Sequence, residues 1–359
     1  MSRGAEQLMK FSEHLAFLRE QEGLLQKDLA KALGISLHAY QRFEYGEQEP
    51  RLAVLAKLAD FYDLSLDALV GRHRSVRVTA LLENTAGREG LCAAHGLSLY
   101  IETPRHKILF DMGPGDEFLS NAEALGVDLT AVDLAVLSHG HDDHGGGLAA
   151  FCRVNDHAPI YLHRSAFGPY YILSDDRDPA YIGLPLGLEE FRDRFIFTDR
   201  EMVIDRELTL FAEPPAVFDA MAASGRLAEK VGTGFQPDAF RHEQNLLIRA
   251  AGRTVLVAGC AHRGVVNILT AAKSKLGEYP DVFFGGFHLF QLPEGEAASD
   301  KLIDEIGRAL LPGKTVYYTG HCTGAYAYDR LKTILGERLR AMSGGMTAEI
   351  GADGIREHR

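Results

Sequence analysis

The stretch "LAVLSHGHDDHGGGLAAF", residues 134–151, decides the fold. An apolar run opens it, three His and two Asp follow within residues 139–144, and three glycines come directly after them. The apolar run predicts a buried strand, and open α/β sheets hold their sites beyond the carboxyl ends of such strands. Glycines there let the backbone approach closely because they have no Cβ. The stretch therefore predicts a site at the end of a strand.

The spacing of the side chains in this stretch indicates two adjacent divalent metal ions. His139 and His141 are spaced to point the same way from an extended turn, whereas Asp143 and His144 turn the other way as a helix begins. Nitrogen-rich ligation favours zinc or iron, and manganese is a further alternative. A solvated polar loop is the competing interpretation, but such loops rarely carry three His and two Asp at this spacing.

Composition sets the broad class of the protein. The chain has 359 residues, enough for two domains, and is 46% hydrophobic and 25% charged, as in ordinary globular proteins. No run approaches the ~20 apolar residues of a membrane span. The four cysteines are scattered, which favours a reducing, cytoplasmic location. The net charge of -12 argues against binding of nucleic acid by overall charge alone.

From Val76 onward, short strands alternate with helices. Pairs of neighbouring apolar runs predict two hairpins, and longer segments between later strands predict helices. Strands joined both by hairpins and by helical crossovers favour an α/β sandwich, in which helices cover the sheets. The expected hairpins are 97–103 with 107–113 and 245–250 with 254–260, and the expected helices are about 263–275, 299–311 and 324–335.

The first 71 residues have a different pattern, in which short helices are separated by single glycines. Gly34 is placed to end a helix that begins near Gln26, Ser36 to cap the next helix, and Gly46 to end it. Short helices with a glycine-containing turn before a polar third helix are typical of a helix-turn-helix.

The segments "QKDLAKALGIS" and "YQRFEYGEQEPRLAVLAKLADFYDLSLDALVG" resemble the Cro/C1-type (XRE) repressor domain. The resemblance implies that the third helix enters the major groove of double-stranded DNA and that the start of the second helix contacts phosphate. A small bundle used only for dimerisation or partner binding is the alternative, since residues 1–75 carry ten Lys and Arg against eleven Asp and Glu. The implied DNA-contacting residues are Gln26, Leu37, His38, Gln41 and Arg42.

"HGHDDH" is similar to the HxHxDH signature of the metallo-β-lactamase superfamily, which implies an αββα sandwich. In that superfamily the first two His bind one metal, the Asp–His pair binds the other, and further ligands come later in the chain. "TVLVAGCAH" and "YYTGHCTG" supply the later ligands here. "ILFDMGPG" matches the DxG turn, so Asp111 is expected to support the ligands from behind. The implied ligands are His139, His141, Asp143, His144, Cys260, His262 and His321, with His242 as an alternative to His262.

Several motifs resemble a narrower branch that contains dihydropterin-methyl-ribofuranosylaminobenzene phosphate synthase-like proteins. They are "LCAAHGLSLYIE", "GCAHRGVVNIL", "GGFHL" and "HCTG". This resemblance implies catalytic or pocket roles for His95 and His288, beside Asp143. Two departures from the branch, Ala94 and the pair His242–Glu243, lie where a substrate pocket is expected, so the substrate is not carried over.

These features predict a domain order and two classes of function. The expected order is a helix-turn-helix domain at 9–71, a linker at 72–77 and a metallo-β-lactamase-fold domain at 78–355. The first hypothesis is a zinc-dependent hydrolase or transferase that acts on a small anionic, pterin-like substrate and also binds DNA as a homodimer. The second is a transcription regulator whose large domain senses a small molecule with little turnover. The full set of ligand-type residues favours the enzyme.

Overall fold

The computed structural model describes residues 10–62, 64, 66–70, 75–212, 214–218, 225–351 and 354–358. The chain divides into two compact units, Met1–Val76 with Thr103–Arg105, and Arg77–Glu102 with His106–Arg359. Residues 9 and 71–74, where the predicted first domain begins and meets the linker, lie outside the described residues. Strand β1 begins at Ser75, so residues 75–77 of the predicted linker are already strand.

Local sequence signals account for the helices of the first unit. Gly34 ends α2 with φ 69° in the left-handed region, and the Oγ of Ser36 accepts a hydrogen bond from the N–H of Ala39 at 3.2 Å. Leu29, Tyr40 and other apolar side chains form its buried core. The helices are α1 (Phe11–Gln21), α2 (Gln26–Leu33), α3 (Leu37–Glu44), α4 (Leu52–Tyr62) and α5 (Leu66–Leu69).

Two large sheets form the centre of the second unit, and both predicted hairpins are present as β2–β3 and β13–β14. In each large sheet the hairpin is followed by parallel strands, which place their carboxyl ends at one edge. Among the described residues the first sheet runs β19 (Gly354–His358), β18 (Thr347–Gly351), β1 (Ser75–Leu82), β2 (Ser98–Glu102), β3 (Lys107–Phe110), β4 (Leu134–Val136), β5 (Ile160–His163), β8 (Phe195–Thr198). The second runs β17 (Leu339–Ala341), β16 (Val316–Thr319), β15 (Val282–Phe284), β14 (Arg253–Val257), β13 (Gln244–Ala250), β10 (Leu208–Ala212), β9 (Glu201–Val203). A small sheet runs β12 (Gly234–Pro237), β11 (Leu227–Val231), β6 (Tyr170–Ile172), β7 (Ala180–Tyr181).

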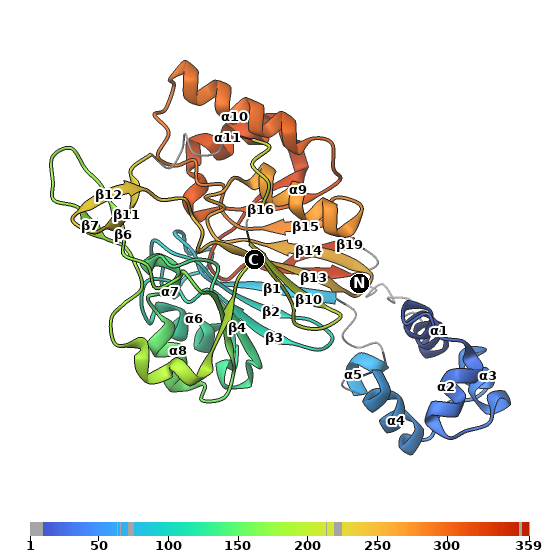
Figure 1. The fold of residues 1–359 in the computed structure, drawn as a ribbon. Helices are drawn as coiled ribbons and strands as arrows, with labels where there is room; N and C mark the ends of the chain where they lie inside the picture. Colours follow the sequence, from blue (N-terminus) through green and yellow to red (C-terminus); the bar gives the residue numbers. More distant parts are fainter. Residues whose placement is uncertain are drawn as a thin grey trace. The chain divides into compact units, whose positions relative to one another are not determined.

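Helices cover the outer faces of both large sheets, as Figure 1 shows. One apolar core packs Leu256 and Phe283 of the second sheet against α9, α10 and α11. The other packs Leu109 and Ile160 of the first sheet against α6 and α8. This confirms the predicted αββα sandwich. The helices are α6 (Glu117–Leu125), α7 (Asp142–Gly145), α8 (Leu148–Val154), α9 (Val265–Leu276), α10 (Ala297–Leu310) and α11 (Ala325–Leu335).

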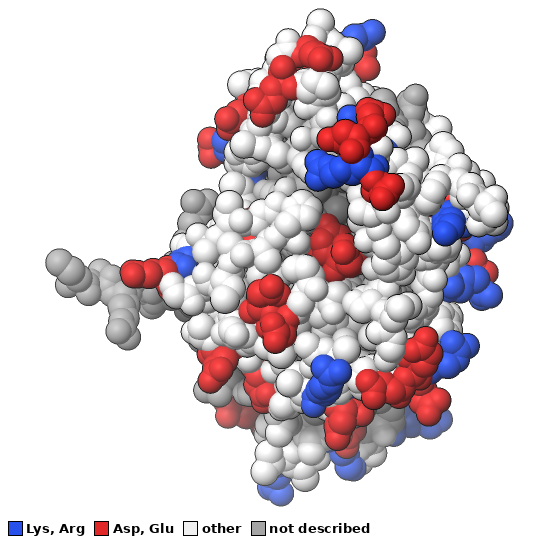
Figure 2. Space-filling view, turned by 90° about the vertical axis from the view of Figure 1, so that its left-hand side faces the viewer, with Lys and Arg blue, Asp and Glu red and all other residues white. Residues whose placement is uncertain are grey.

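Among the described residues, no helix combines the length and apolar character that crossing a bilayer requires. On the face drawn in Figure 2, acidic and basic side chains are interspersed and form no continuous basic surface. This distribution agrees with the net charge of -12.

A half-buried histidine joins the β2–β3 turn to the β9–β10 turn, and we expect it to make stability depend on pH. The Nε2 of His106 lies 2.7 Å from the Oδ2 of Asp205, and its Nδ1 lies 3.5 Å from the Oδ1 of Asp133. Burial opposes protonation, but these carboxylates raise the pKa of His106 from 6.5 to about 9. The charged ring therefore stabilises the folded state fully below pH 6.5, and this contribution is lost as the pH rises to about 9.

We expect the free energy of unfolding of the large unit to fall by on the order of 2 kcal/mol across this range. Urea unfolding followed by circular dichroism at several pH values measures it. The stability of the His106→Gln variant should fall less across this range than that of the wild type, and a variant that kept the full wild-type dependence would contradict the assignment.

Candidate metal centre

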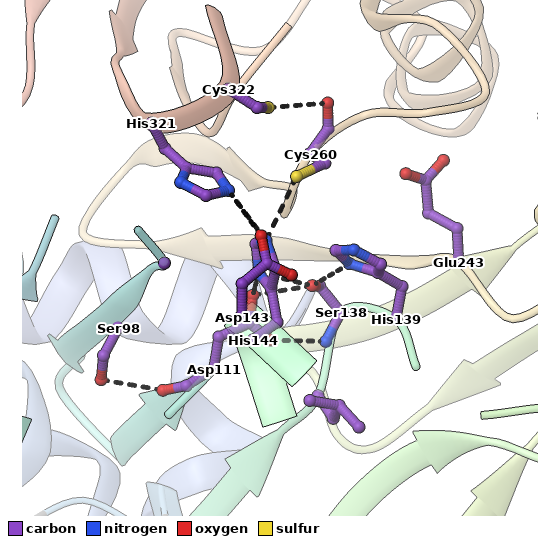
Figure 3. Close-up of polar contacts among 12 residues, drawn as sticks. Ser98, Asp111, Ser138, His139, Asp143, His144, Glu243, Cys260, His321 and Cys322 are labelled. Atoms are coloured by element: carbon purple, nitrogen blue, oxygen red, sulfur yellow. Dashed lines mark hydrogen bonds and ion pairs between the residues drawn. The ribbon is translucent and has the colours of Figure 1, made fainter. Parts of the chain in front are cut away.

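The ends of three strands bring the predicted ligands together, as Figure 3 shows. His139 follows β4, Cys260 follows β14 and His321 follows β16, so residues far apart in sequence meet at one edge of the sandwich. Their ligand atoms form overlapping groups in which all atoms lie within 4.8 Å of one another. The groups are Asp143, His144, Cys260 and His321; His139, Cys260 and His262; and His139, His141 and Asp143.

Hydrogen bonds orient two of the imidazoles so that their Nε2 atoms face each other. The Nδ1 of His144 donates to the Oδ2 of Asp111 at 2.6 Å, and the Nδ1 of His321 donates to the Oδ1 of Asn84 at 2.8 Å. In neutral rings held this way, both Nε2 atoms are acceptors. They lie 3.2 Å apart, and the Sγ of Cys260 lies 3.2 Å from the Nε2 of His144. Two acceptors at this distance are stabilised by a proton or a metal ion between them.

A second chain of hydrogen bonds runs from Asp111 to His139. The Oγ of Ser138 donates to the Oδ2 of Asp111 at 2.7 Å and can therefore accept from the Nδ1 of His139, 2.8 Å away. That leaves the Nε2 of His139 as an acceptor, 3.3 Å from the Nε2 of His262. Asp111 is fully buried and also accepts from the N–H of Ser138 at 2.7 Å. It lies behind the ligands, in the place that the sequence predicts.

The two histidines that the sequence left as alternatives lie in different surroundings. His242 is engaged at both ring nitrogens, because its Nδ1 accepts from the N–H of Gly140 at 2.9 Å and its Nε2 lies 3.0 Å from the Oδ2 of Asp238. His262 directs its Nε2 toward His139, as above. The Nε2 of His141 is buried without a hydrogen bond, 3.9 Å from the Oδ2 of Asp238. These contacts favour His262 over His242 as a ligand.

The electrostatics of the centre favour a positive charge. Although burial raises it, the pKa of Asp143 is held far below its ordinary value by the neighbouring imidazoles of His144 and His321. Burial lowers the pKa of His144, but the carboxylates of Asp143 and Asp111 outweigh it and raise that pKa to about 9. Burial holds the pKa of His139 well below 6.5. The centre therefore takes up positive charge, as a proton on His144 or as a metal ion.

Several residues outside the shared sequence motifs support the ligands. Asn84 orients His321, and the carboxylate of Glu83 accepts a hydrogen bond from the N–H of His321. Glu243 accepts from the N–H groups of His262 at 2.6 Å and Arg263 at 3.0 Å. Burial raises the pKa of Glu243 to about 7. The departure from the family pattern at residues 242–243 could have pointed to the role of Glu243. No feature of the sequence around Asn84 indicated that it contacts a ligand.

The two predicted catalytic histidines differ in exposure. The side chain of His95 is 54% exposed, with its Nε2 3.5 Å from the Oδ2 of Asp143. His288 is buried, with its ring centre 4.1 Å from that of His262. Their catalytic roles stay predictions. Of the two cysteines outside the candidate centre, Cys92 is exposed and Cys152 is buried.

The predicted DNA-contacting residues lie on α2 and α3 of the first unit. Leu37 and His38 are exposed at the start of α3. The Nε2 of Gln41 donates to the Oε1 of Gln26 at 3.1 Å, so these two side chains are joined. The Nε of Arg42 lies 3.7 Å from a carboxylate oxygen of Glu47 at the surface. All five residues therefore belong to one pair of helices.

Comparison with known proteins agrees with this geometry. The family model of the metallo-beta-lactamase superfamily matches residues 94–321, which is more than half of the chain. The chain belongs to the metallo-β-lactamase superfamily. It is 26% identical over 282 residues to the 7,8-dihydropterin-6-methyl-4-(beta-D-ribofuranosyl)-aminobenzene-5'-phosphate synthase of Methanocaldococcus jannaschii, covering 71% of this chain and 90% of that protein. Tm1679, a metal-dependent hydrolase of the beta-lactamase superfamily, has a similar structure, with TM-score 0.66, 26% identity, and coverage of 77% of this chain and 99% of that one.

The first unit also has relatives. A helix-turn-helix family model matches residues 15–69. The cryptic phage CTXphi transcriptional repressor RstR of Vibrio cholerae is 41% identical over 64 residues, which are 18% of this chain and 57% of that protein. The chain thus combines a helix-turn-helix domain with a metallo-β-lactamase-fold domain.

Proposed function

We propose that the large domain is a metal-dependent hydrolase or transferase with two zinc ions that acts on a small anionic substrate. The observation that carries the proposal is the convergence of the Nε2 atoms of His144 and His321, which lie 3.2 Å apart. Asp143 and Cys260 add anionic ligands to the same point. His139, His141 and His262 would hold the first ion, and Asp143, His144 and His321 the second, with Cys260 between them.

The chain's own residues would hold and orient the reactants. Bound ions supply Lewis-acid activation of a water molecule or of a phosphate leaving group. The carboxylate of Asp143 would bind the second ion. Asp111 would hold His144 in the tautomer that binds metal. His95 is partly exposed and 3.5 Å from Asp143, so it would contact the substrate as it enters. Its pKa lies below 6.5, because burial and the nearby His321 disfavour its charged form.

The substrate class follows from the relative and from the chemistry of the centre. The similarity to the dihydropterin synthase supports a pterin-like phosphate substrate. Two routes fit the same residues: attack by water on a phosphate ester, or departure of diphosphate from a pterin methyl carbon that an electron-rich aromatic ring then attacks. The metal-binding residues serve both routes equally.

Metal content and activity test this proposal together. The purified full chain should contain up to two equivalents of zinc, and a chelator should abolish turnover that added zinc restores. We would assay hydrolysis of bis(p-nitrophenyl) phosphate and transfer from a dihydropterin-methyl diphosphate to an aminobenzene acceptor. A chain that takes up no divalent ion overturns the proposal. A metal-loaded chain that turns over neither probe but binds a pterin phosphate would favour the sensor function.

We further propose that the first domain binds double-stranded DNA in a sequence-specific way, as a homodimer on paired half-sites. The similarity to RstR and the exposed start of α3 support this function. We expect the variant Gln41→Ala, Arg42→Ala to bind its operator about 10- to 100-fold more weakly, because each base contact is worth ~1–3 kcal/mol. Electrophoretic mobility shift with genomic fragments at fixed salt measures the change.

A matched double variant on the same domain serves as the control. Arg51→Ala with Glu49→Ala changes two exposed side chains outside α2 and α3 and should leave the shift unchanged. Zinc content should be the same in all three proteins. If the wild-type chain retards no fragment at low salt, the DNA-binding proposal is wrong.

A further inference from the structure

A second group of soft ligands lies beside the two-metal centre and shares only Cys260 with it. Cys260, His288 and Cys322 each follow one of three neighbouring parallel strands, β14, β15 and β16. One ligand atom from each residue lies within 4.8 Å of the other two. All three residues are at least 95% buried. Parallel strands thus bring two sulfurs and one imidazole to one point.

The imidazole of this group lacks the partners that a buried ring needs. Neither ring nitrogen of His288 has a hydrogen bond among the described residues. A buried polar group without a partner costs about 1–3 kcal/mol, so such a group is rarely kept without a ligand. The backbone also makes room for the sulfur, because a Cβ on residue Gly286 would lie 2.2 Å from the Sγ of Cys322.

We propose that Cys260, His288 and Cys322 form a third cation site, selective for a soft, thiophilic ion such as Zn²⁺ or Cu⁺. Two thiolates and one imidazole, with no carboxylate, are a donor set that such ions prefer and Mg²⁺ or Ca²⁺ do not. Sulfurs that share one zinc ion lie at most ~4.6 Å apart, close to the 4.8 Å within which these three ligand atoms lie. Each thiol releases its proton to water when the ion binds.

The shared cysteine links this site to the two-metal centre. The Sγ of Cys260 lies 3.2 Å from the Nε2 of His144, a predicted ligand of that centre. An ion on the third site would therefore bind the same Cys260 sulfur that would lie between the two catalytic ions. Excess soft cation should then inhibit the enzyme, and this inhibition should require Cys322.

The test is titration of the metal-free full chain with Cd²⁺, followed by the ultraviolet absorption of cadmium–thiolate bonds. We expect Cys322→Ser to lose about half of the saturating absorbance, since one of two thiolates is gone, and His288→Gln to weaken binding about tenfold or more. Cys152→Ser removes a buried thiol outside the group and should match the wild type. His139→Ala with His141→Ala should keep the absorbance, because this site uses neither residue.

A further measurement does not depend on whether a variant folds. X-ray absorption on the fully zinc-loaded wild type should show more sulfur neighbours per zinc than a centre with Cys260 alone provides. The proposal is overturned if Cys322→Ser keeps the full cadmium absorbance with wild-type circular dichroism, or if zinc has only the sulfur of Cys260. Either result leaves the two-metal centre standing. Loss of all metal in the His139, His141 double variant would instead show that the third site does not exist independently.

Discussion

Replacing both His139 and His141 with Ala should remove zinc from the first set of ligands and lower kcat/KM at least about 1000-fold. Metal activation supplies several kcal/mol of transition-state stabilisation, and each 1.4 kcal/mol is about tenfold in rate. Both rings are buried, and the Nε2 of His139 faces that of His262 at 3.3 Å. Removing both rings therefore leaves His262 as the single imidazole of the first set of ligands, which is too few to bind the ion. Metal analysis and steady-state kinetics on the same preparations measure the two losses.

The matched control replaces two exposed histidines, His157 and His358, with Ala. Their side chains are 58% and 61% exposed and lie outside the metal-binding groups. This variant should keep the zinc content and the activity of the wild type. If the His139, His141 variant retained two equivalents of zinc and full activity, the ligand assignment of the first ion would be wrong.

The sequence predicted the αββα sandwich well because the relevant signals are local. The apolar run before Ser138 and the spacing of His139 and His141 can be read within one turn and one strand. Cys260 and His321 could be placed because each follows an apolar run at a motif that the superfamily shares. Strand ends then meet at one edge of the sheets for the general reason that parallel strands end together.

The part that sequence could not settle depends on long-range contacts. The choice between His242 and His262 rests on the N–H of Gly140, which lies 102 residues before His242 and occupies its Nδ1. The role of Asn84 rests on a contact with His321, 237 residues later. No periodicity or motif predicts these contacts. The ring nitrogen of a histidine that stays free to bind metal depends on which distant segments pack against it.

The same limit applies in the first domain, where a part-buried ion pair between α1 and α3 orients some of the predicted DNA-contacting residues. The Nε of Arg19 lies 2.6 Å from the Oε1 of Glu44, whose side chain is only 3% exposed. Glu44 also accepts hydrogen bonds from Tyr40 at 2.6 Å and from Gln26 at 2.7 Å. Because Gln26 in turn accepts from Gln41, the carboxylate orients two predicted DNA contacts at once. Arg19 and Glu44 are 25 residues apart, so local patterns gave no sign of the pair.

We expect Glu44→Ala to destabilise the helix-turn-helix domain by about 3 kcal/mol, because it removes the carboxylate that accepts from the part-buried Arg19 and from Tyr40 and Gln26. Amide hydrogen exchange of residues 26–44 in the full chain, read by mass spectrometry, should become at least about 100-fold faster, and operator binding should be lost. Glu47→Ala is the matched control. It removes an exposed carboxylate 3.7 Å from Arg42, a pair worth at most ~1 kcal/mol, so its exchange should change less than about fivefold. Equal exchange in the two variants would show that the Arg19–Glu44 pair does not stabilise this domain.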